Sequence, residues 1–235
     1  MPTKCARPPA PPANSNARRP AMSCDRLEFE RALWRRGLAR VAGVDEAGRG
    51  PLAGPVLAAA VILPAHWAQT GLPAELAGLN DSKQLTATRR EKYYAFILHC
   101  PEIQWARAQV DAARIDAINI LQATHCAMNE ALAGLASPPE HALVDGRPVP
   151  SLRVPQTALI KGDARSYSIA AASVVAKVTR DHLMLEYHAQ WPHYGFADHK
   201  GYGTATHLAA IAKHGPCPIH RQTFAPLKTR EPELW

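Results

Sequence analysis

The sequence predicts an α/β fold, because short apolar segments alternate along the chain with longer segments of helical periodicity. The apolar run 56–63 has the length of a buried strand, whereas 166–191 has the length and small-residue content of a close-packed helix. The chain has 235 residues, of which 47% are hydrophobic and 20% charged, so one domain with a sizeable core is expected.

The expected elements follow the spacing of apolar residues in chain order. An amphipathic helix is predicted over 25–36, followed by strands over 41–44 and 55–63. The remaining predictions are a helix over 86–99, a strand over 103–110, a helix over 111–135, strands over 141–144 and 157–160, and helices over 166–191 and 204–214.

Residues 1–22 differ from the rest in composition, with six prolines, four basic residues and no acid. This composition predicts a disordered leader, followed by a single domain over 23–235, and Met22 is an alternative start. The leader carries four of the seven net positive charges. The remaining basicity is therefore weak evidence for a polyanionic partner.

The location predicted for the chain is cytoplasmic. No apolar run has the length of a membrane span, and the first residues lack the apolar core of a secretory signal. The five cysteines are scattered without a CxxC pair, which is typical of a reducing compartment. His214, Cys217 and His220 are spaced three apart, but three candidate ligands between prolines do not favour a zinc site.

The most informative segment is Val41–Gly50, in which a strand leads to Asp45 and Glu46 and then to Gly48-Arg49-Gly50. Adjacent carboxylates raise each other's pKa unless a cation compensates, and Mg²⁺ or Mn²⁺ prefers such oxygen ligands. Neighbouring side chains of a strand point to opposite faces, so both acids serve one site only if the strand ends or bends there. The two glycines allow the backbone and a guanidinium to approach a phosphate or a 2′-hydroxyl.

Two other glycine motifs overlap this segment. A P-loop fails, because Arg49-Gly50 stands where Lys-Ser/Thr is needed. Gly48-x-Gly50-x-x-Ala53 formally fits a dinucleotide-binding fingerprint, which would make the protein an oxidoreductase. That fingerprint needs a following helix, whereas the run 56–63 predicts a strand.

Two further acids follow apolar strand candidates. Asp145 comes after Ala142–Val144 and precedes a glycine, and Asp163 follows 158–160 and Lys161-Gly162. Each alone suits a turn or a helix cap. Three strands that end in an acid beside glycine nevertheless predict one site, because active sites gather at strand ends of parallel sheets.

Other polar residues are candidates for substrate contacts. Ser166, Ser173 and Lys177 share one face of the helix predicted over 166–191, a polar stripe that also suits a packed helix. Tyr202 lies between glycines among basic residues and can stack on a sugar or base. The loop Asn80-Asp81-Ser82-Lys83 suits a helix cap or donors to phosphate.

Taken together, these motifs resemble bacterial ribonuclease HII, a type 2 ribonuclease H family. The resemblance runs in order from about Val41 to Pro226, and the leader is not part of it. The motifs are Gly43-Val-Asp-Glu-Ala-Gly-Arg-Gly50, Asn80-Asp-Ser-Lys83, Asp145-Gly146, Lys161-Gly-Asp163, Ala170-Ala-Ala-Ser-Val-Val-Ala-Lys177 and His199-Lys-Gly-Tyr202.

The resemblance implies a ribonuclease H fold, a mixed sheet flanked by helices with a helical C-terminal portion. It implies an endonuclease that cuts the RNA strand of RNA–DNA hybrids, and cuts 5′ to ribonucleotides within duplex DNA, leaving 3′-hydroxyl and 5′-phosphate ends. Partners are the nucleic acids, the cofactor is Mn²⁺ or Mg²⁺, and a monomer is expected. A binder of RNA–DNA hybrids without catalysis is the alternative from another class.

The resemblance also assigns roles to residues. The catalytic and metal-binding acids are Asp45, Glu46, Asp145 and Asp163. The substrate-binding residues are Gly48, Arg49, Gly50, Asn80, Ser82, Lys83, Ser173, Lys177 and Tyr202.

Overall fold

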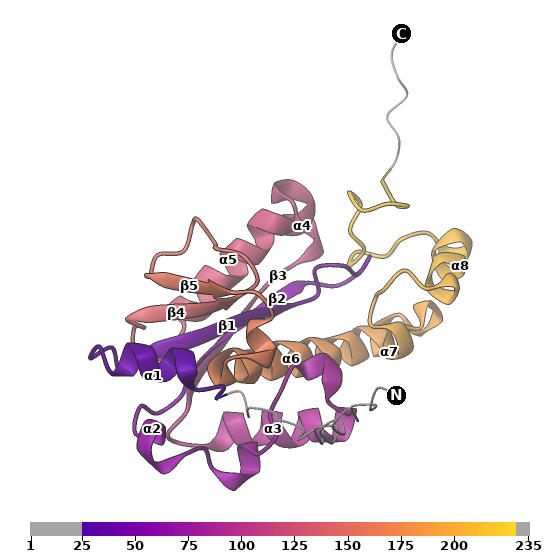
Figure 1. Cartoon of the computed structure of the whole chain (residues 1–235). Helices are drawn as coiled ribbons and strands as arrows, with labels where there is room; N and C mark the ends of the chain where they lie inside the picture. Colours follow the sequence, from indigo (N-terminus) through magenta and orange to yellow (C-terminus); the bar gives the residue numbers. More distant parts are fainter. Residues whose placement is uncertain (1–24, 229–235) are drawn as a thin grey trace, which may run out of the picture.

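The computed structural model describes residues 25–228, so the leader predicted over 1–22 lies outside the described residues (Figure 1). A five-stranded sheet has the order β3-β2-β1-β4-β5. Strands β1, β2 and β3 are antiparallel neighbours, and β4 and β5 run parallel to β1, which confirms a mixed sheet. The strands are β1 (Val41–Ala47), β2 (Val56–Ile62), β3 (Gln104–Val110), β4 (His141–Asp145) and β5 (Gln156–Leu159).

The longer helices lie near the positions that the sequence predicts, whereas the short helices α2 and α7 were not predicted. The helices are α1 (Glu28–Trp34), α2 (Trp67–Thr70), α3 (Ala87–His99), α4 (Ala112–Ile118), α5 (Ile120–Ala133), α6 (Tyr167–Gln190), α7 (Phe196–His199) and α8 (Ala205–His214), with short 3₁₀ turns that include η2 (Ser82–Gln84) and η3 (Gly162–Ala164).

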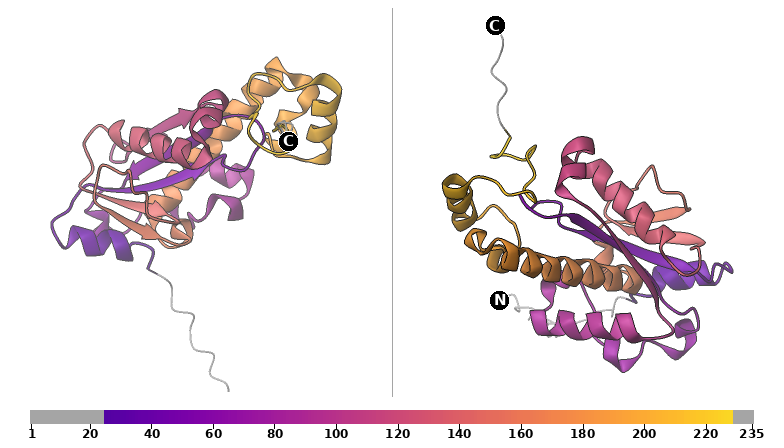
Figure 2. Two further views of the ribbon diagram at one scale, coloured as in Figure 1. Left: turned by 90° about the horizontal axis from the view of Figure 1, so that it is seen from above. Right: turned by 180° about the vertical axis from the view of Figure 1, so that it is seen from behind.

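Helices cover both faces of the sheet, with α5 on one face and α6 on the other, and α3 packs outside α6 (Figures 1 and 2). The alternation of β2 supplies both cores. Leu57, Ala59 and Val61 pack toward α6, whereas Ala58 and Ala60 pack toward α5. The continuous apolar run of β2 is therefore explained by burial on two sides.

Helix α6 lies unusually close to β1. A Cβ atom at Gly43 would lie 2.0 Å from the backbone carbon of Ser168, so only glycine permits this approach. On the helix side, Ala170, Ala171 and Ala172 are fully buried and present little bulk to the sheet. The small residues of the 166–191 segment are thus explained by helix–sheet packing.

The N-terminal end of α6 is tied to α1 by a buried carboxylate. Glu30 Oε1 accepts hydrogen bonds from Ser166 Oγ (2.6 Å), Ser168 Oγ (2.7 Å) and the Ser168 backbone N–H (3.0 Å). A negative group is favourable at a helix N-terminus, where backbone N–H groups lack helical partners. Ser166, which the sequence placed on a polar stripe, therefore has a structural role as the N-cap of α6.

Several element boundaries differ from the predictions, including a division of one helix and an extension of one strand. The helix predicted over 111–135 is divided into α4 and α5, because Asn119 has φ 66° and its side chain caps α5 by accepting from the N–H groups of Leu121 and Gln122. Apolar periodicity continues through this point, so it gave no sign of the break. Strand β1 extends to Ala47 rather than ending at Val44.

Helices α7 and α8 follow the C-terminal end of α6 and lie beyond the sheet (Figure 2). Their small core includes Tyr194 and Phe196 and two fully enclosed histidines, His207 and His220, whose Nε2 atoms lie 3.0 Å apart. His214 is exposed and does not join His220 and Cys217 in one ligand set; among the described residues, the potential metal-binding group contains only aspartates.

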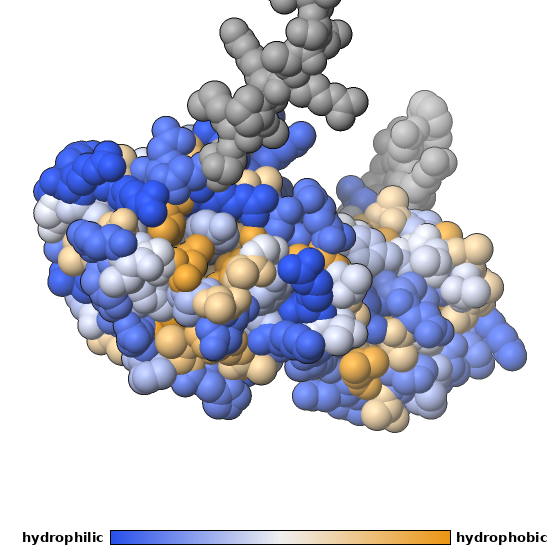
Figure 3. Space-filling model, turned by 60° about the horizontal axis from the view of Figure 1, so that its bottom comes forward, coloured by the Kyte–Doolittle hydropathy of each residue, from blue (hydrophilic) through white to orange (hydrophobic). Residues whose placement is uncertain are grey.

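The surface and the thiols agree with the composition. On the face shown in Figure 3, hydrophilic residues predominate and apolar residues form small groups. No helix within residues 25–228 is long and apolar enough to cross a membrane. Cys100, Cys126 and Cys217 are free thiols.

The buried histidines predict a pH dependence of stability. Burial, with His207 nearby, lowers the pKa of His220 to about 4, below its usual value of about 6.5. Because the unfolded chain then binds the proton more readily, this contribution to stability is complete above about pH 6.5 and is lost as the pH falls toward 4. We expect the melting temperature of a His220→Phe variant to depend less steeply on pH over this range than that of the wild type. An equal dependence of melting temperature on pH in both proteins would contradict this role of His220.

Candidate active site

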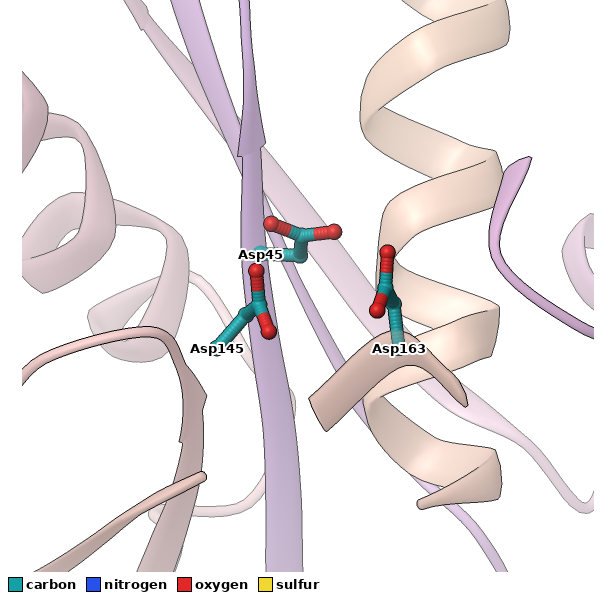
Figure 4. A group of neighbouring side chains, drawn as sticks. All are labelled: Asp45, Asp145 and Asp163. Carbon is teal, nitrogen blue, oxygen red and sulfur yellow. The ribbon is translucent and has the colours of Figure 1, made fainter. Parts of the chain in front are cut away.

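Three aspartates that are distant in sequence meet at one edge of the sheet (Figure 4). Asp45 lies on β1, Asp145 ends β4 and Asp163 lies in η3, just before α6. One carboxylate oxygen from each residue lies within 4.8 Å of the others. Asp45 and Asp163 are buried and Asp145 is partly exposed. The structure thus brings together three of the four predicted acids.

The pairing of β1 with β4 explains the first two positions. Val44 is the register partner of Val144 in the parallel pair, so the next residues, Asp45 and Asp145, follow side by side. Val44 and Val144 face the α5 core, and alternation therefore turns both aspartates toward the α6 side.

Asp163 reaches the pair through the loop after β5. Lys161 adopts a left-handed conformation (φ 55°), which turns the chain toward the sheet edge. The N–H of Gly162 then donates to Asp145 Oδ1 at 2.6 Å, and a Cβ on Gly162 would lie only 3.2 Å from that oxygen. Glycine at this position thus lets the loop approach Asp145 closely.

The three charges repel one another strongly. At 4.8 Å and an effective dielectric constant of about 20, each pair of carboxylates repels by roughly 3.5 kcal/mol. Burial, together with Glu46 and Asp145, raises the pKa of Asp45 well above its usual value, and burial with Asp145 raises that of Asp163 to about 6. Among residues 25–228, none of the three aspartates forms an ion pair with Lys or Arg.

This donor set fits a divalent cation. Hard cations such as Mg²⁺ and Mn²⁺ take carboxylate oxygens, and a cation among the three aspartates would offset the repulsion between them. Asp45, Asp145 and Asp163 are therefore the residues that would hold it.

Glu46 lies apart from the group of three. Strand β1 continues to Ala47, so it does not end at the paired acids, and the alternation of a strand predicts opposite faces for Asp45 and Glu46. The carboxylate of Glu46 pairs with Arg49 at 3.2 Å, and Glu46 lines both the cleft beside Asp45 and a second hollow with Asp145 and His125. Burial raises the pKa of Glu46, Arg49 opposes that rise, and Asp145 adds to it. Glu46 thus borders the aspartate group from the other side of β1.

A cleft beside Asp45 contains most of the predicted substrate-binding residues. Its lining comes from the loop after β1, from η2, from α6 and from the turn before α8, and it includes Gly48, Arg49, Gly50, Ser82, Lys83, Ser173, Lys177 and Tyr202. Asn80 is not among the lining residues; its side chain donates to Gln84 Oε1.

Several predicted contacts within the cleft have partners of their own. Ser173 Oγ donates to Ser82 Oγ at 2.8 Å, and Lys177 Nζ lies 2.8 Å from Asp181. Lys83 and Tyr202 are exposed. The cleft therefore offers cationic groups, hydroxyl groups and an aromatic ring.

The presence of strand β2 after the glycine motif excludes the hypothesis that this motif binds a dinucleotide. The fingerprint requires a helix after the glycines, and β2 begins at Val56 instead. Gly48 itself has φ +96°, and a Cβ there would lie 2.2 Å from Arg180 Nε. This glycine is needed for both its conformation and its close packing.

Sequence reasoning missed two buried arginines, Arg180, which lines this cleft, and Arg221, which donates to the carbonyls of its glycine loop. Arg180 lies one turn after Lys177 on α6, so the polar stripe could have been extended to it. Arg221 follows α8 in a segment without periodicity, and no local signal distinguishes it from a solvated arginine.

A mixed sheet with clustered carboxylates, beside a cleft with cationic, glycine and aromatic walls, defines a metal-dependent nuclease of the ribonuclease H type. The family model of ribonuclease HII matches residues 42–227. The chain belongs to the ribonuclease HII family. It is an endoribonuclease that acts on RNA–DNA hybrids.

Individual relatives agree with this assignment. The ribonuclease HII of Geobacter metallireducens is 56% identical over 200 residues, covering 85% of this chain and 90% of the relative. That of Chlorobaculum parvum is 56% identical over 198 residues, covering 84% and 94%. The crystal structure of ribonuclease H2 from Pyrococcus horikoshii has a TM-score of 0.66 at 26% identity, covering 80% of this chain and 95% of that one.

Cation binding should stabilise the fold. At a metal concentration of 100 times the Kd, the free energy of unfolding rises by about 2.7 kcal/mol, which corresponds to roughly 5–10 °C for a domain of this size. We expect Mn²⁺ or Mg²⁺ to raise the melting temperature of the wild type by this amount, and of an Asp145→Asn variant far less. Glu91→Gln, which removes an exposed acid, is the matched control. An equal rise in Asp145→Asn would place the cation elsewhere.

Proposed function

We propose that this enzyme hydrolyses the RNA strand of RNA–DNA hybrids and also cuts 5′ to ribonucleotides embedded in duplex DNA, leaving 3′-hydroxyl and 5′-phosphate ends. The observation that carries this proposal is the group of Asp45, Asp145 and Asp163 beside the Gly48–Gly50 loop. The phosphate to be cut and the sugar to be recognised are neighbours in the substrate, and so are these two parts of the protein.

The three aspartates, with Glu46 at the border of the group, hold Mn²⁺ or Mg²⁺. When bound, the cation supplies a water of lowered pKa and stabilises charge on the leaving 3′-oxygen. The protein's own contribution is to fix the carboxylates before substrate arrives. Asp145 accepts a hydrogen bond from the Gly162 N–H, and the Asp45 side chain on β1 is buried.

The polar wall of the cleft binds the phosphate backbone. Lys83 and Lys177 supply positive charge, and the Ser82 and Ser173 hydroxyls are linked to each other beside them. Asn80 supports this wall through its bond to Gln84 rather than from within the cleft.

Ribose is distinguished from deoxyribose by the Gly48–Gly50 loop and Tyr202, which also line the cleft. The 2′-hydroxyl both donates and accepts hydrogen bonds, and the backbone of Gly48-Arg49-Gly50 can approach it closely. The exposed ring of Tyr202 stacks on the neighbouring sugar and favours a deoxyribose there. We further propose that the enzyme acts as a monomer in the cytoplasm.

Replacement of Asp45 or Asp145 by Asn should lower the cleavage rate of a labelled RNA–DNA hybrid by about a thousandfold, because several kcal/mol of transition-state stabilisation depend on the bound cation. Circular dichroism should show an intact fold, and Glu91→Gln should retain the wild-type rate. Metal-dependent cutting by the wild type excludes the alternative of a non-catalytic hybrid binder. Wild-type rates in both Asn variants at saturating Mg²⁺ or Mn²⁺ would refute the assignment.

Tyr202→Ala should lower the rate at a single ribonucleotide within duplex DNA by about tenfold, because stacking on an aromatic ring contributes about 1–3 kcal/mol per base. Binding to plain duplex DNA should change less. Tyr202→Phe, which keeps the ring, should retain the rate and serves as control. The measurement compares matched duplexes with one ribonucleotide, an RNA run or none. Unchanged discrimination in Tyr202→Ala would place ribose recognition elsewhere.

A further inference from the structure

The adjacent residues His220 and Arg221 lie buried between the Gly48–Gly50 loop and the turn that carries Tyr202. They belong to the segment after α8, and His220 pairs with Ala53 in an isolated β-bridge. Successive side chains of an extended segment point to opposite sides, so the two residues reach in different directions.

His220 connects to Tyr202 through His207. The Cys217 backbone N–H, which can only donate, bonds to His220 Nδ1 at 2.9 Å. The hydrogen of neutral His220 is therefore on Nε2, which donates to His207 Nε2 at 3.0 Å. His207 Nδ1–H in turn donates to the Tyr202 carbonyl at 2.9 Å. The pattern of partners thus assigns one tautomer to each ring, and the hydrogen bonds run in one direction from Cys217 to Tyr202.

Arg221 connects to the glycine loop. Its guanidinium donates to the carbonyls of Gly48, Arg49 and Gly54, at 3.0 Å for Arg49. Within residues 25–228 it forms no ion pair with an acid, so its charge is stabilised by these carbonyls. Arginine suits this role because its planar fork reaches several acceptors at once.

These bonds determine which way the loop's amide groups point. In a trans peptide the C=O of one residue and the N–H of the next point in opposite directions. With the carbonyls of Gly48 and Arg49 turned to Arg221, the N–H groups of Arg49 and Gly50 point away from it. In the described part of the chain neither N–H donates a backbone or side-chain hydrogen bond. Two neighbouring donors are thus left for a ligand in the cleft.

The loop and the tyrosine also lie close to each other. A Cβ atom on Gly50 would lie 3.5 Å from Tyr202 Cε1, so the ring packs beside the loop. Gly201, next to Tyr202, accepts a hydrogen bond from the Leu52 N–H, and the Leu52 carbonyl accepts one from the Arg221 N–H. The same short segment therefore contacts both parts of the proposed ribose site, the Gly48–Gly50 loop and the turn that carries Tyr202.

We propose that His220 and Arg221 are positioning residues that together hold the Gly48–Gly50 loop and Tyr202 in one relative arrangement, so that the amide donors and the aromatic ring engage adjacent nucleotides. This inference rests on the proposed function for its effect on cleavage. Because the two side chains belong to consecutive residues, displacement of the Gly48–Gly50 loop also displaces the turn that carries Tyr202.

The first test measures the coupling without substrate. Arg221→Lys keeps the charge but loses the fork, and His220→Phe keeps a ring but loses both hydrogen bonds. Hydrogen–deuterium exchange should become faster at the hydrogen-bonded amides of both segments in each variant, namely Leu52 in 48–52 and Tyr202 and Thr204 in 201–204. The control is Leu135→Ala, a change in the α5-side core near the start of β3. It should leave both segments at the wild-type exchange rate. If each variant affects only its own side, the proposal is overturned, whatever the enzyme cleaves.

The second test measures selectivity as kcat and KM on duplexes with one ribonucleotide and with an RNA run. Each variant should lose about tenfold in the ratio of the two kcat/KM values, since a hydrogen bond to a charged group or a stacked ring has roughly this effect. In a Tyr202→Ala background, His220→Phe should cost less selectivity than in the wild type, because only the part that depends on the Gly48–Gly50 loop remains to be lost. Equal losses on both substrates and in both backgrounds would indicate mere destabilisation and overturn the proposal. Absence of metal-dependent cutting by the wild type would instead refute the proposed function, and the exchange test would still decide the coupling.

Discussion

The arrangement of the site depends on the close contact between β1 and the first turn of α6. Gly43 leaves no room for a side chain against Ser168, and the buried alanines of the helix match it. Because Asp163 precedes α6 by only a few residues, the depth at which the helix packs determines how near this carboxylate comes to Asp45. A helix held farther away by a larger residue would separate the acids and weaken the cation site.

Electrostatics and packing oppose each other at this edge. Carboxylates at this separation destabilise the fold, and their raised pKa values record that cost. The carboxylates stay close to one another despite this cost because neighbouring groups hold them in place. The Gly162 N–H donates to Asp145, and Ser173 lies beside Asp45. Such strain is typical of sites that gain their stability from a bound cation.

Much of the fold could be predicted, because β2 is a continuous apolar run and because the apolar residues of β1, β4 and β5 are followed by a glycine or an acid. The candidate acids Asp45, Asp145 and Asp163 followed from the same pattern. The face occupied by Glu46 could not be predicted, since it depends on whether β1 continues past Asp45, and three-residue differences in strand length leave no clear signal. The break at Asn119 was missed because the apolar positions of α4 and α5 continue in phase. Arg221 was missed because burial of a charged side chain is decided by distant carbonyls, not by its neighbours in sequence.

The buried carboxylate of Glu30 has a consequence for where the working unit begins. The match to the family model starts at residue 42, after α1, yet Glu30 occupies the donors at the first turn of α6. A protein trimmed to the matched region would leave the Ser166 and Ser168 hydroxyls and a backbone N–H without their acceptor, directly beside the segment that carries Asp163. The boundary of the family model is therefore narrower than the boundary given by hydrogen bonding, and α1 belongs to the catalytic body although it supplies no residue to the cleft.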